Sequence, residues 1–299
     1  MDHPIYDYAP LPLRPGSAAA GTLRAFALLF LEHWELCAPP DAVRDPRLVG
    51  EFGSFTPDYR SWTQREYGLR IGVFRVLDAL RDAGIRPVVA ANAMAVQRLP
   101  GLVRTLQDAG CEWLAHGVAA TRMMHSGMDL AQQRLHIAQS IDALAQATGT
   151  RPTGWLSQDW GTTPDTHGLL AEAGIRYTLD WCNDDQPYWQ HTEPPLLAIP
   201  LSAEWDDVQC QWLRHVEPRA HAALAAAAFD RLRRECQAHR RDAVFGLSLH
   251  PWVSGMPSRI QALRDLLQQV RGAPDVVWTT PQAIFTDTIT AGHTPHGLS

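Results

Sequence analysis

The sequence predicts a single α/β barrel of about seven strand–helix units. Short apolar runs of strand length alternate with amphipathic segments of helical length along almost the whole 299-residue chain. No linker or low-complexity segment interrupts the series, although this length would also allow two ordinary domains. Polar and aromatic side chains follow four of the expected strands. Since catalytic groups in parallel barrels lie at the carboxyl ends of the strands, we expect a functional site at that end.

The first expected strand, residues 24–31, is a continuous apolar run, the pattern of a strand that is covered on both faces. Further strands are expected at residues 86–91, 112–115, 153–155, 177–179, 196–200, 244–249 and 276–278. Helices are expected at residues 70–83, 100–109, 130–149, 164–173, 220–239 and 259–271. Glycine ends four of these helices, at positions 84, 110, 149 and 174, because it adopts the left-handed conformation of a C-cap without strain.

The chain is expected to consist of an arm, one barrel domain and a tail. Residues 1–21 should form an irregular arm, because prolines at positions 4, 10, 12 and 15 deny it a regular hydrogen-bonded ladder. Residues 22–290 should form the barrel, and residues 291–299 a flexible C-terminal tail.

Composition excludes several function classes. The net charge of −6 provides no basic field for nucleic acid or an anionic membrane. All 26 basic residues are arginine, which excludes a catalytic Schiff-base lysine and a P-loop lysine. The five cysteines are scattered and form no Cys-x-x-Cys pair, so neither a zinc ribbon nor a disulfide framework is expected. No secretory leader and no membrane-length apolar run is evident. We therefore expect a cytoplasmic protein with a small-molecule substrate, assembled as a homo-dimer or homo-tetramer.

The segment 151–188 is rich in residues that are costly to bury. It contains Arg151, three tryptophans and, besides the helical Glu172, five carboxylates. Charged groups are seldom buried unless they are paired, whereas tryptophan is usually covered. A segment that combines the two is expected to line a cleft. The alternative is a solvated loop that holds one or two ion pairs.

The four conspicuous strand ends are Glu32–His33, His116, residues 155–159 and His250. Unusual polar residues at four successive strand ends favour an enzyme over a purely structural barrel.

Four motifs occur together within residues 24–285. They are Arg65-Glu66-Tyr67-Gly68 with Arg70, Gly72 and Arg75; Arg151-Pro152 with Gly154-Trp155; Asn183-Asp184-Asp185 with Pro187-Tyr188; and Leu249-His250-Pro251 with Gly255 and Pro257-Ser258-Arg259. With them the chain resembles the polysaccharide deacetylase (NodB-homology) superfamily, and within it the branch of metal-independent allantoinases and cyclic imide hydrolases. The resemblance implies a distorted (β/α)7 barrel of NodB type and hydrolysis of an amide-type C–N bond.

The resemblance also raises the question of a metal. Metal-dependent members carry two adjacent aspartates after the first strand and a His-x-x-x-His pair after a later one. Here Glu32-His33 occupies the first place, and Ala120 stands four residues after His116. The remaining candidate metal ligands are His33 and His116, whereas catalytic zinc has three protein ligands. We expect no obligatory metal, with a divalent ion such as Zn2+ as the alternative.

Amide hydrolysis needs a base for water and an acid for the leaving nitrogen. Glu32 is the candidate base, because a carboxylate at the mouth of an apolar strand is partly desolvated and its pKa should rise. His250 is the candidate acid, since imidazole titrates near neutrality, and Asp184 or Asp185 is expected to orient it. By resemblance, Arg151 would hold the catalytic carboxylate through a bidentate fork. The alternatives are a salt-bridged Glu32, a structural Arg151 and a His250 satisfied in the core.

The substrate pocket is expected to include Trp34, Trp155 and Trp181 as walls, with His116 and Asp184 as polar contacts. Stacked tryptophans are also good core residues, which is the alternative for each of them.

The sequence thus predicts a hydrolase of a small, cyclic amide, ureide or imide, acting on a C–N bond other than a peptide bond. The first alternative is a metal-dependent N-deacetylase of an amino sugar or glycan. The second is a catalytically inactive barrel that serves as a binding or assembly protein.

Overall fold

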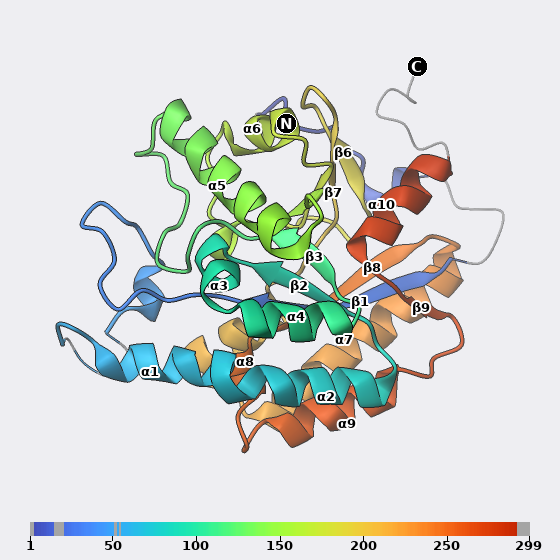
Figure 1. Cartoon of the computed structure of the whole chain (residues 1–299). Helices are drawn as coiled ribbons and strands as arrows, with labels where there is room; N and C mark the ends of the chain where they lie inside the picture. Colours follow the sequence, from blue (N-terminus) through green and yellow to red (C-terminus); the bar gives the residue numbers. More distant parts are fainter. Residues whose placement is uncertain (1–2, 15–20, 51–52, 54, 292–299) are drawn as a thin grey trace.

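A computed structural model describes residues 3–14, 21–50, 53 and 55–291. Most of the expected C-terminal tail, from residue 292 on, and residues 1–2 and 15–20 of the expected arm lie outside the described residues. Within the described part, the chain forms one sheet surrounded by helices (Figure 1). No helix in that part is both long and apolar enough to cross a bilayer.

The sheet has nine strands in the described residues. They are β1 Leu23–Leu31, β2 Pro87–Ala91, β3 Glu112–Ala115, β4 Gly154–Trp155, β5 Tyr177–Thr178, β6 Tyr188–Gln190, β7 Leu196–Ala198, β8 Ala243–Leu249 and β9 Val276–Trp278. Their spatial order is β6-β7-β5-β4-β3-β2-β1-β8, and β9 also pairs with β1. All pairs are parallel except β6 with β7.

The central strand β1 explains the distortion of the barrel. Strand β8 pairs with β1 along Leu23–Leu29, so it occupies one edge. The other edge is divided, because β9 pairs with Leu23–Ala25 and β2 with Ala27–Leu31. The predicted α/β barrel with parallel strands is confirmed, as a mixed α/β half-barrel consistent with a distorted barrel.

Ten α-helices surround the sheet in the described residues. They are α1 Tyr59–Tyr67, α2 Val73–Ala83, α3 Ala93–Arg98, α4 Pro100–Asp108, α5 Leu130–Thr148, α6 Thr166–Glu172, α7 Pro218–His239, α8 Pro251–Ser254, α9 Ile260–Val270 and α10 Pro281–Thr290. The expected glycine caps follow α2 and α5, where Gly84 and Gly149 have φ of 68° and 76°. Helix α5 also begins with a capping box between Asp129 and Gln132.

Strand alternation divides the core into two layers. The odd residues of β1, such as Leu29, pack with α2, α7 and α9 on the helix side of the sheet. The even residues, Phe26, Leu28 and Phe30, pack with residues of β2, β3, β7 and β8 in the barrel interior. Because successive side chains of a strand point to opposite faces, this parity fixes which strand-end residues face the interior.

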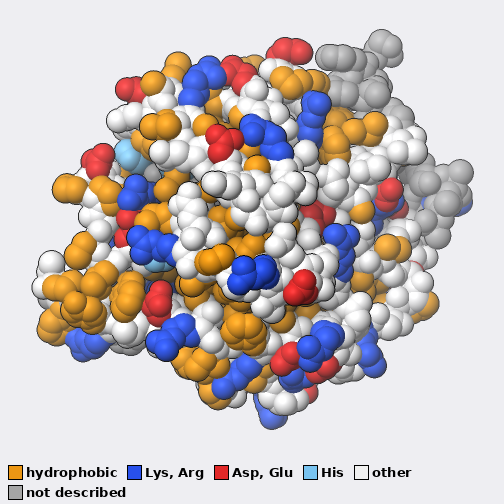
Figure 2. Space-filling model, in the orientation of Figure 1, with side chains coloured by type: hydrophobic (Ala, Val, Ile, Leu, Met, Phe, Trp, Pro, Cys, Tyr) orange, Lys and Arg blue, Asp and Glu red, His pale blue; other side chains and the backbone are white. Residues whose placement is uncertain are grey.

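Charges of both signs are interspersed on the face shown in Figure 2. Hydrophobic side chains gather there around the start of α1, a part of the chain in which Val49, Phe55 and Tyr59 are exposed.

Candidate active site

Parity brings five polar residues to the interior at the carboxyl ends of the strands. They are Glu32 after β1, Asn92 after β2, His116 after β3, Gln158 after β4 and His250 after β8, and all five are buried. All five have even numbers, the parity of the residues in these strands that face the barrel interior. The structure therefore brings Glu32, His116 and His250 to the same end of the barrel, and the roles expected of them stay predictions.

The aromatic ring of Phe30 lies between the two histidines. The imidazole of His250 stacks on it with ring centroids 3.8 Å apart, and His116 meets it edge-on at 5.3 Å. Both imidazoles contact the ring of Phe30, and both lie close enough to Glu32 for their charges to act on its carboxylate.

Glu32 is buried and bound by polar neighbours. The side-chain amide of Gln158 donates to Glu32 Oε1 at 2.6 Å, and His116 Nε2 lies 3.5 Å from the same oxygen. Burial acts to raise the pKa of Glu32, but His116, the charge of His250 and the Gln158 amide together lower it to about 2. The expectation that desolvation would dominate and raise this pKa is therefore wrong, because the sequence did not reveal how many hydrogen-bond donors and positive charges surround the carboxylate.

His116 presents one ring nitrogen to the site. Its Nδ1 lies 2.7 Å from the carbonyl oxygen of Leu156, which requires that Nδ1 carry the proton. Nε2 then faces Glu32, and 3.5 Å is long for a hydrogen bond. This nitrogen is buried and has no hydrogen-bond partner among the described residues. At this distance Nε2 makes no hydrogen bond to Glu32, and it can accept one from a water molecule.

Asp159 supplies a second carboxylate. Gln158 Nε2 also donates to Asp159 Oδ2 at 3.2 Å, so one amide bridges Asp159 and Glu32. Burial and the adjacent charge of Glu32 raise the pKa of Asp159 to about 7. Asp159 and the following Trp160 both have left-handed backbone conformations, with φ of 48° and 54°. Strain of this kind in non-glycine residues is concentrated at functional sites.

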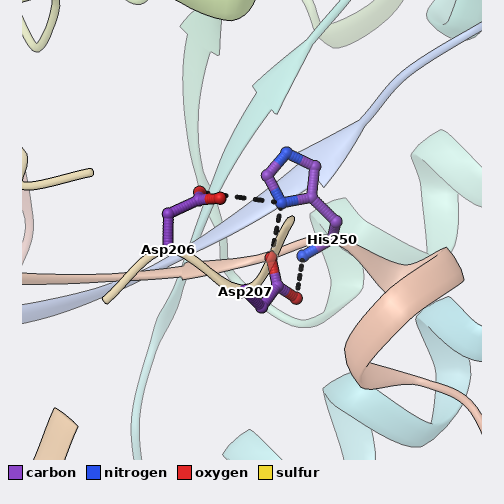
Figure 3. Close-up of side chains that lie close together, drawn as sticks. All are labelled: Asp206, Asp207 and His250. Atoms are coloured by element: carbon purple, nitrogen blue, oxygen red, sulfur yellow. Dashed lines mark hydrogen bonds and ion pairs between the residues drawn. The ribbon is translucent and has the colours of Figure 1, made fainter. Parts of the chain in front are cut away.

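His250 is held by two consecutive aspartates, Asp206 and Asp207 (Figure 3). Asp207 Oδ1 lies 2.6 Å from His250 Nδ1, and Asp207 Oδ2 accepts from the His250 backbone N–H at 2.8 Å and from the Ser254 hydroxyl. Asp206 Oδ2 is 3.9 Å from the same Nδ1. Burial acts to lower the pKa of His250, but the charges of Asp207 and Asp206 and the hydrogen bond to Asp207 raise it to about 9.

A contact between glycines positions the residues that follow His250. A Cβ atom on Gly72 would lie 2.1 Å from the carbonyl oxygen of Pro251, and one on Gly255 would lie 2.4 Å from the Cα of Gly72. The π-helical turn Gly68–Gly72 therefore touches helix α8 backbone to backbone. This contact explains the glycines of the first and last motifs: they let the chain after His250 approach closely.

The donor set does not fit a metal centre of the expected kind. In the described residues, the one group of three potential ligands is Asp206, Asp207 and His250, not a group containing His33 or His116. Both oxygens of Asp207 and Nδ1 of His250 are occupied by their mutual hydrogen bonds. The charges that act on the side chain of His33 belong to Arg98 and Glu35. The arrangement is that of an imidazole braced by carboxylates.

The predicted role of Arg151 is wrong. Its guanidinium is exposed and pairs with Asp142 at 3.1 Å, and it contacts the carbonyl oxygen of Ala173. The reason is positional: Arg151 precedes β4, so it lies at the amino end of a strand, opposite the site. Glu32 is held by Gln158 instead.

Asp184 and Asp185 do not orient His250, so this prediction is also wrong. Asp184 forms a two-pronged ion pair with Arg14 of the N-terminal arm. The backbone oxygen of Asp185 accepts from Val244 N at 2.8 Å, which places this segment beside the start of β8, away from the carboxyl end where His250 lies. The same contacts contradict the prediction that Asp184 binds substrate at the site.

The tryptophans predicted to form pocket walls differ in position. Trp155 is fully buried on the helix side of the sheet, so its assignment to the pocket is wrong: parity points Leu156, not Trp155, into the barrel. Trp34 is buried beside the guanidinium of Arg65, 4.8 Å from the ring centroid. Trp181 lines a cavity of about 510 Å³. For Trp34 and Trp181 the role in substrate binding stays a prediction.

The sequence analysis missed Asp206 and Asp207 altogether. They follow strand β7 and immediately precede a π-helical turn, Val208–Leu213, whose residues lack a regular apolar period. An acidic pair at the carboxyl side of an expected strand was the available signal. Asn92 was missed as well, although it follows the expected second strand; its side chain accepts from His33 N at 3.1 Å and donates to the carbonyl oxygen of His116.

Comparisons with known proteins agree with this fold. The family model for polysaccharide deacetylase matches residues 67–178. The chain is 24% identical over 252 residues to a putative polysaccharide deacetylase of Schizosaccharomyces pombe, covering 76% of this chain and 75% of that protein. Among solved structures it resembles Puue allantoinase, with a TM-score of 0.78, 26% identity and 95% of both chains covered.

It also resembles a probable polysaccharide deacetylase of Pseudomonas aeruginosa, with a TM-score of 0.79, 26% identity, and 91% of this chain and 92% of that chain covered. These findings support the prediction of a hydrolase that acts on carbon–nitrogen bonds other than peptide bonds. Together with the barrel fold, they support the polysaccharide deacetylase (NodB-homology) superfamily that the sequence motifs indicated.

Proposed function

We propose that the chain hydrolyses the C–N bond of a small cyclic amide, ureide or imide, with a carboxylate pair as the base and His250 as the acid. The observation that carries this proposal is the presence of two oppositely tuned sets of groups, close enough for the charge of His250 to act on Glu32. Glu32 and Asp159 share the amide of Gln158, and His250, stacked on Phe30, is held by Asp207.

The base would be the pair of Glu32 and Asp159 acting together. Glu32, with a pKa of about 2, is ionised at neutral pH, and burial together with the charge of Glu32 raises the pKa of Asp159 to about 7. Two coupled carboxylates titrate as a unit, so near neutrality the pair can accept one proton from water. The oxygen of that water then attacks the carbonyl carbon, and the pair holds the released proton.

The acid would be His250. With a pKa of about 9, its imidazole carries a proton at neutral pH, and Asp207 fixes the ring through Nδ1. The proton on the opposite nitrogen, Nε2, can pass to the amide nitrogen as the C–N bond breaks. A ring substrate would open to a carboxylate and an amine or amide, with one water consumed.

Two observations favour a small substrate and metal-independent water activation. Glu32, His116 and His250 are all buried, so the reacting bond must reach an enclosed site. In the described residues, no group of three potential metal ligands includes Glu32 or His116. The likeness to Puue allantoinase over 95% of both chains supports the choice of a cyclic ureide or a related ring.

The second candidate is an N-deacetylase of an amino sugar or glycan. It is favoured by the description of the matching family model and by the curated relative, both of which are named for polysaccharide deacetylation. That reaction also breaks an amide C–N bond, so the same acid and base could serve it.

A substrate screen separates the two candidates. Purified protein would be incubated with allantoin, hydantoin, succinimide and an N-acetylated sugar oligomer, each with and without a chelator. The proposal expects ring opening of at least one cyclic substrate that persists after chelation. Release of acetate that disappears on chelation, with no ring opening, would establish the deacetylase instead.

A further inference from the structure

A cavity of about 510 Å³ lies beside the catalytic groups and is walled by aromatic side chains. Its lining includes Ile5 and Tyr6 of the N-terminal arm, Trp160, Asp180, Trp181 and Ala203. The volume falls within the range of about 300–1,000 Å³ that is typical of sites for small ligands. Neither Glu32 nor His250 lines it, so it is a neighbour of the acid–base groups and distinct from them.

Two chain segments connect this cavity to the catalytic groups. Trp160 directly follows Asp159, so their Cα atoms are about 3.8 Å apart. Ala203 stands three residues before Asp206 on the connection that leaves β7. Asp180, at the carboxyl end of β5, accepts hydrogen bonds from the backbone and side chain of Ser157. The cavity therefore opens at the same end of the barrel as the active site.

Among the described residues, the one carboxylate that lines the cavity is already paired. The carboxylate of Asp180 is satisfied by Ser157 and by His167, whose Nε2 lies 3.1 Å away. The lining is otherwise dominated by the rings of Tyr6, Trp160 and Trp181. Flat rings match such aromatic walls.

The N-terminal arm is fixed over the cavity by specific contacts. His191 N donates to the carbonyl oxygen of Ile5 at 2.7 Å, and the ring of Tyr6 packs 5.8 Å from Trp181 and 5.1 Å from Tyr188. Farther along the arm, Arg14 pairs with Asp184. The arm is thus a built part of the cavity wall.

We propose that this cavity is the subsite for the planar part of the substrate, and that Tyr6 of the arm selects for its aromatic or extended ring. The inference deepens the proposed function and rests on it, because it names the substrate class: planar cyclic imides and ureides with a flat apolar extension. The reacting bond would lie at Asp159 and Glu32, and the extension would lie between Tyr6, Trp160 and Trp181.

The test compares phthalimide, which carries a fused benzene ring, with succinimide, which does not. Binding of each probe would be measured by isothermal titration calorimetry in the Glu32→Gln background, so that the readout does not depend on turnover. Tyr6→Ala should weaken phthalimide binding about tenfold and succinimide binding less than about twofold, since an aromatic contact selects for the fused ring. Tyr6→Phe should restore phthalimide binding.

The matched control is Tyr8→Ala, two residues along the same arm, whose side chain is 71% exposed and does not line the cavity. It should leave both affinities unchanged. Equal losses in Tyr6→Ala and Tyr8→Ala, an unchanged phthalimide affinity in Tyr6→Ala, or no phthalimide binding at all would overturn the inference. Hydrolysis would be measured separately on the protein without substitutions. If phthalimide binding depends on Tyr6 but that protein hydrolyses no amide, the proposed function fails and the subsite stands. If amides are hydrolysed but Tyr6 has no effect, only the subsite fails.

Discussion

Asp207→Asn should change the pH range over which the enzyme works. Asp207 makes the shortest contact of His250, 2.6 Å from Oδ1 to Nδ1, and is the largest of the influences that raise the pKa of the imidazole to about 9. Relative to an ordinary value of 6.5, that elevation corresponds to about 3 kcal/mol in favour of the charged ring. The elevation persists although burial opposes it, so Asp207, Asp206 and Glu32 together supply more than this net amount, with Asp207 the largest contributor.

Asparagine is nearly isosteric but uncharged. With the carboxylate removed, burial should dominate and bring the pKa of His250 below neutrality. The alkaline limb of kcat/KM should then move from about pH 9 to below pH 7, because the protonated imidazole is the active form. At pH 8 the loss should reach about 100-fold, the usual contribution of a general acid.

The assay is a pH profile of kcat/KM on an active cyclic substrate, with the imidazole of His250 titrated in parallel by NMR. Asp206→Asn is the matched control, since Asp206 lies 3.9 Å from the same nitrogen and makes no hydrogen bond to it. Asp206→Asn should shift the limb in the same direction by less. An alkaline limb that stays near pH 9 in Asp207→Asn would refute the assignment of His250 as the acid.

Four further outcomes are expected. Asp159→Asn should move the acid limb of the profile from about pH 7 toward the pKa of Glu32, about 2, because the base then titrates alone; an unmoved limb in a pH–rate profile would remove Asp159 from the pair. Glu32→Gln should lower kcat by at least about 100-fold, with the melting temperature showing whether the fold is intact. Arg151→Ala should leave kcat/KM within about twofold and cost no more than about 1 kcal/mol in a denaturant titration, since its ion pair with Asp142 is exposed. Dialysis against a chelator should leave turnover of the cyclic substrate unchanged, and a loss restored by added Zn2+ would contradict metal-independent water activation.

The sequence predicted the parts of the site that depend on strand position. Glu32 and His250 follow long apolar runs and His116 follows a short strand, and the period of two along a strand determines the face on which all three emerge. The same period shows why Trp155 was misplaced, since its neighbour Leu156 has the interior parity.

What the sequence could not supply is the placement of groups on irregular segments. Asp206 and Asp207 enter the site from a loop that leads into a π-helical turn, and neither has a periodic signal. Arg151 was assigned from a motif shared with other proteins, although it precedes its strand and so lies at the opposite end. The helices α1, α3, α8 and α10 and strand β6 were not expected, because they are short or lack a clear apolar period.

The close approach of Gly72 and Gly255 has a consequence for engineering this protein. A contact made only by main-chain atoms cannot be relieved by choosing another rotamer, so even one added methyl group must displace helix α8 and the imidazole at its start. Libraries that aim to alter ring preference should therefore leave these two positions constant and diversify the arm instead. Exposed residues of the arm tolerate substitution, and substitutions there should leave the pKa of His250 unchanged.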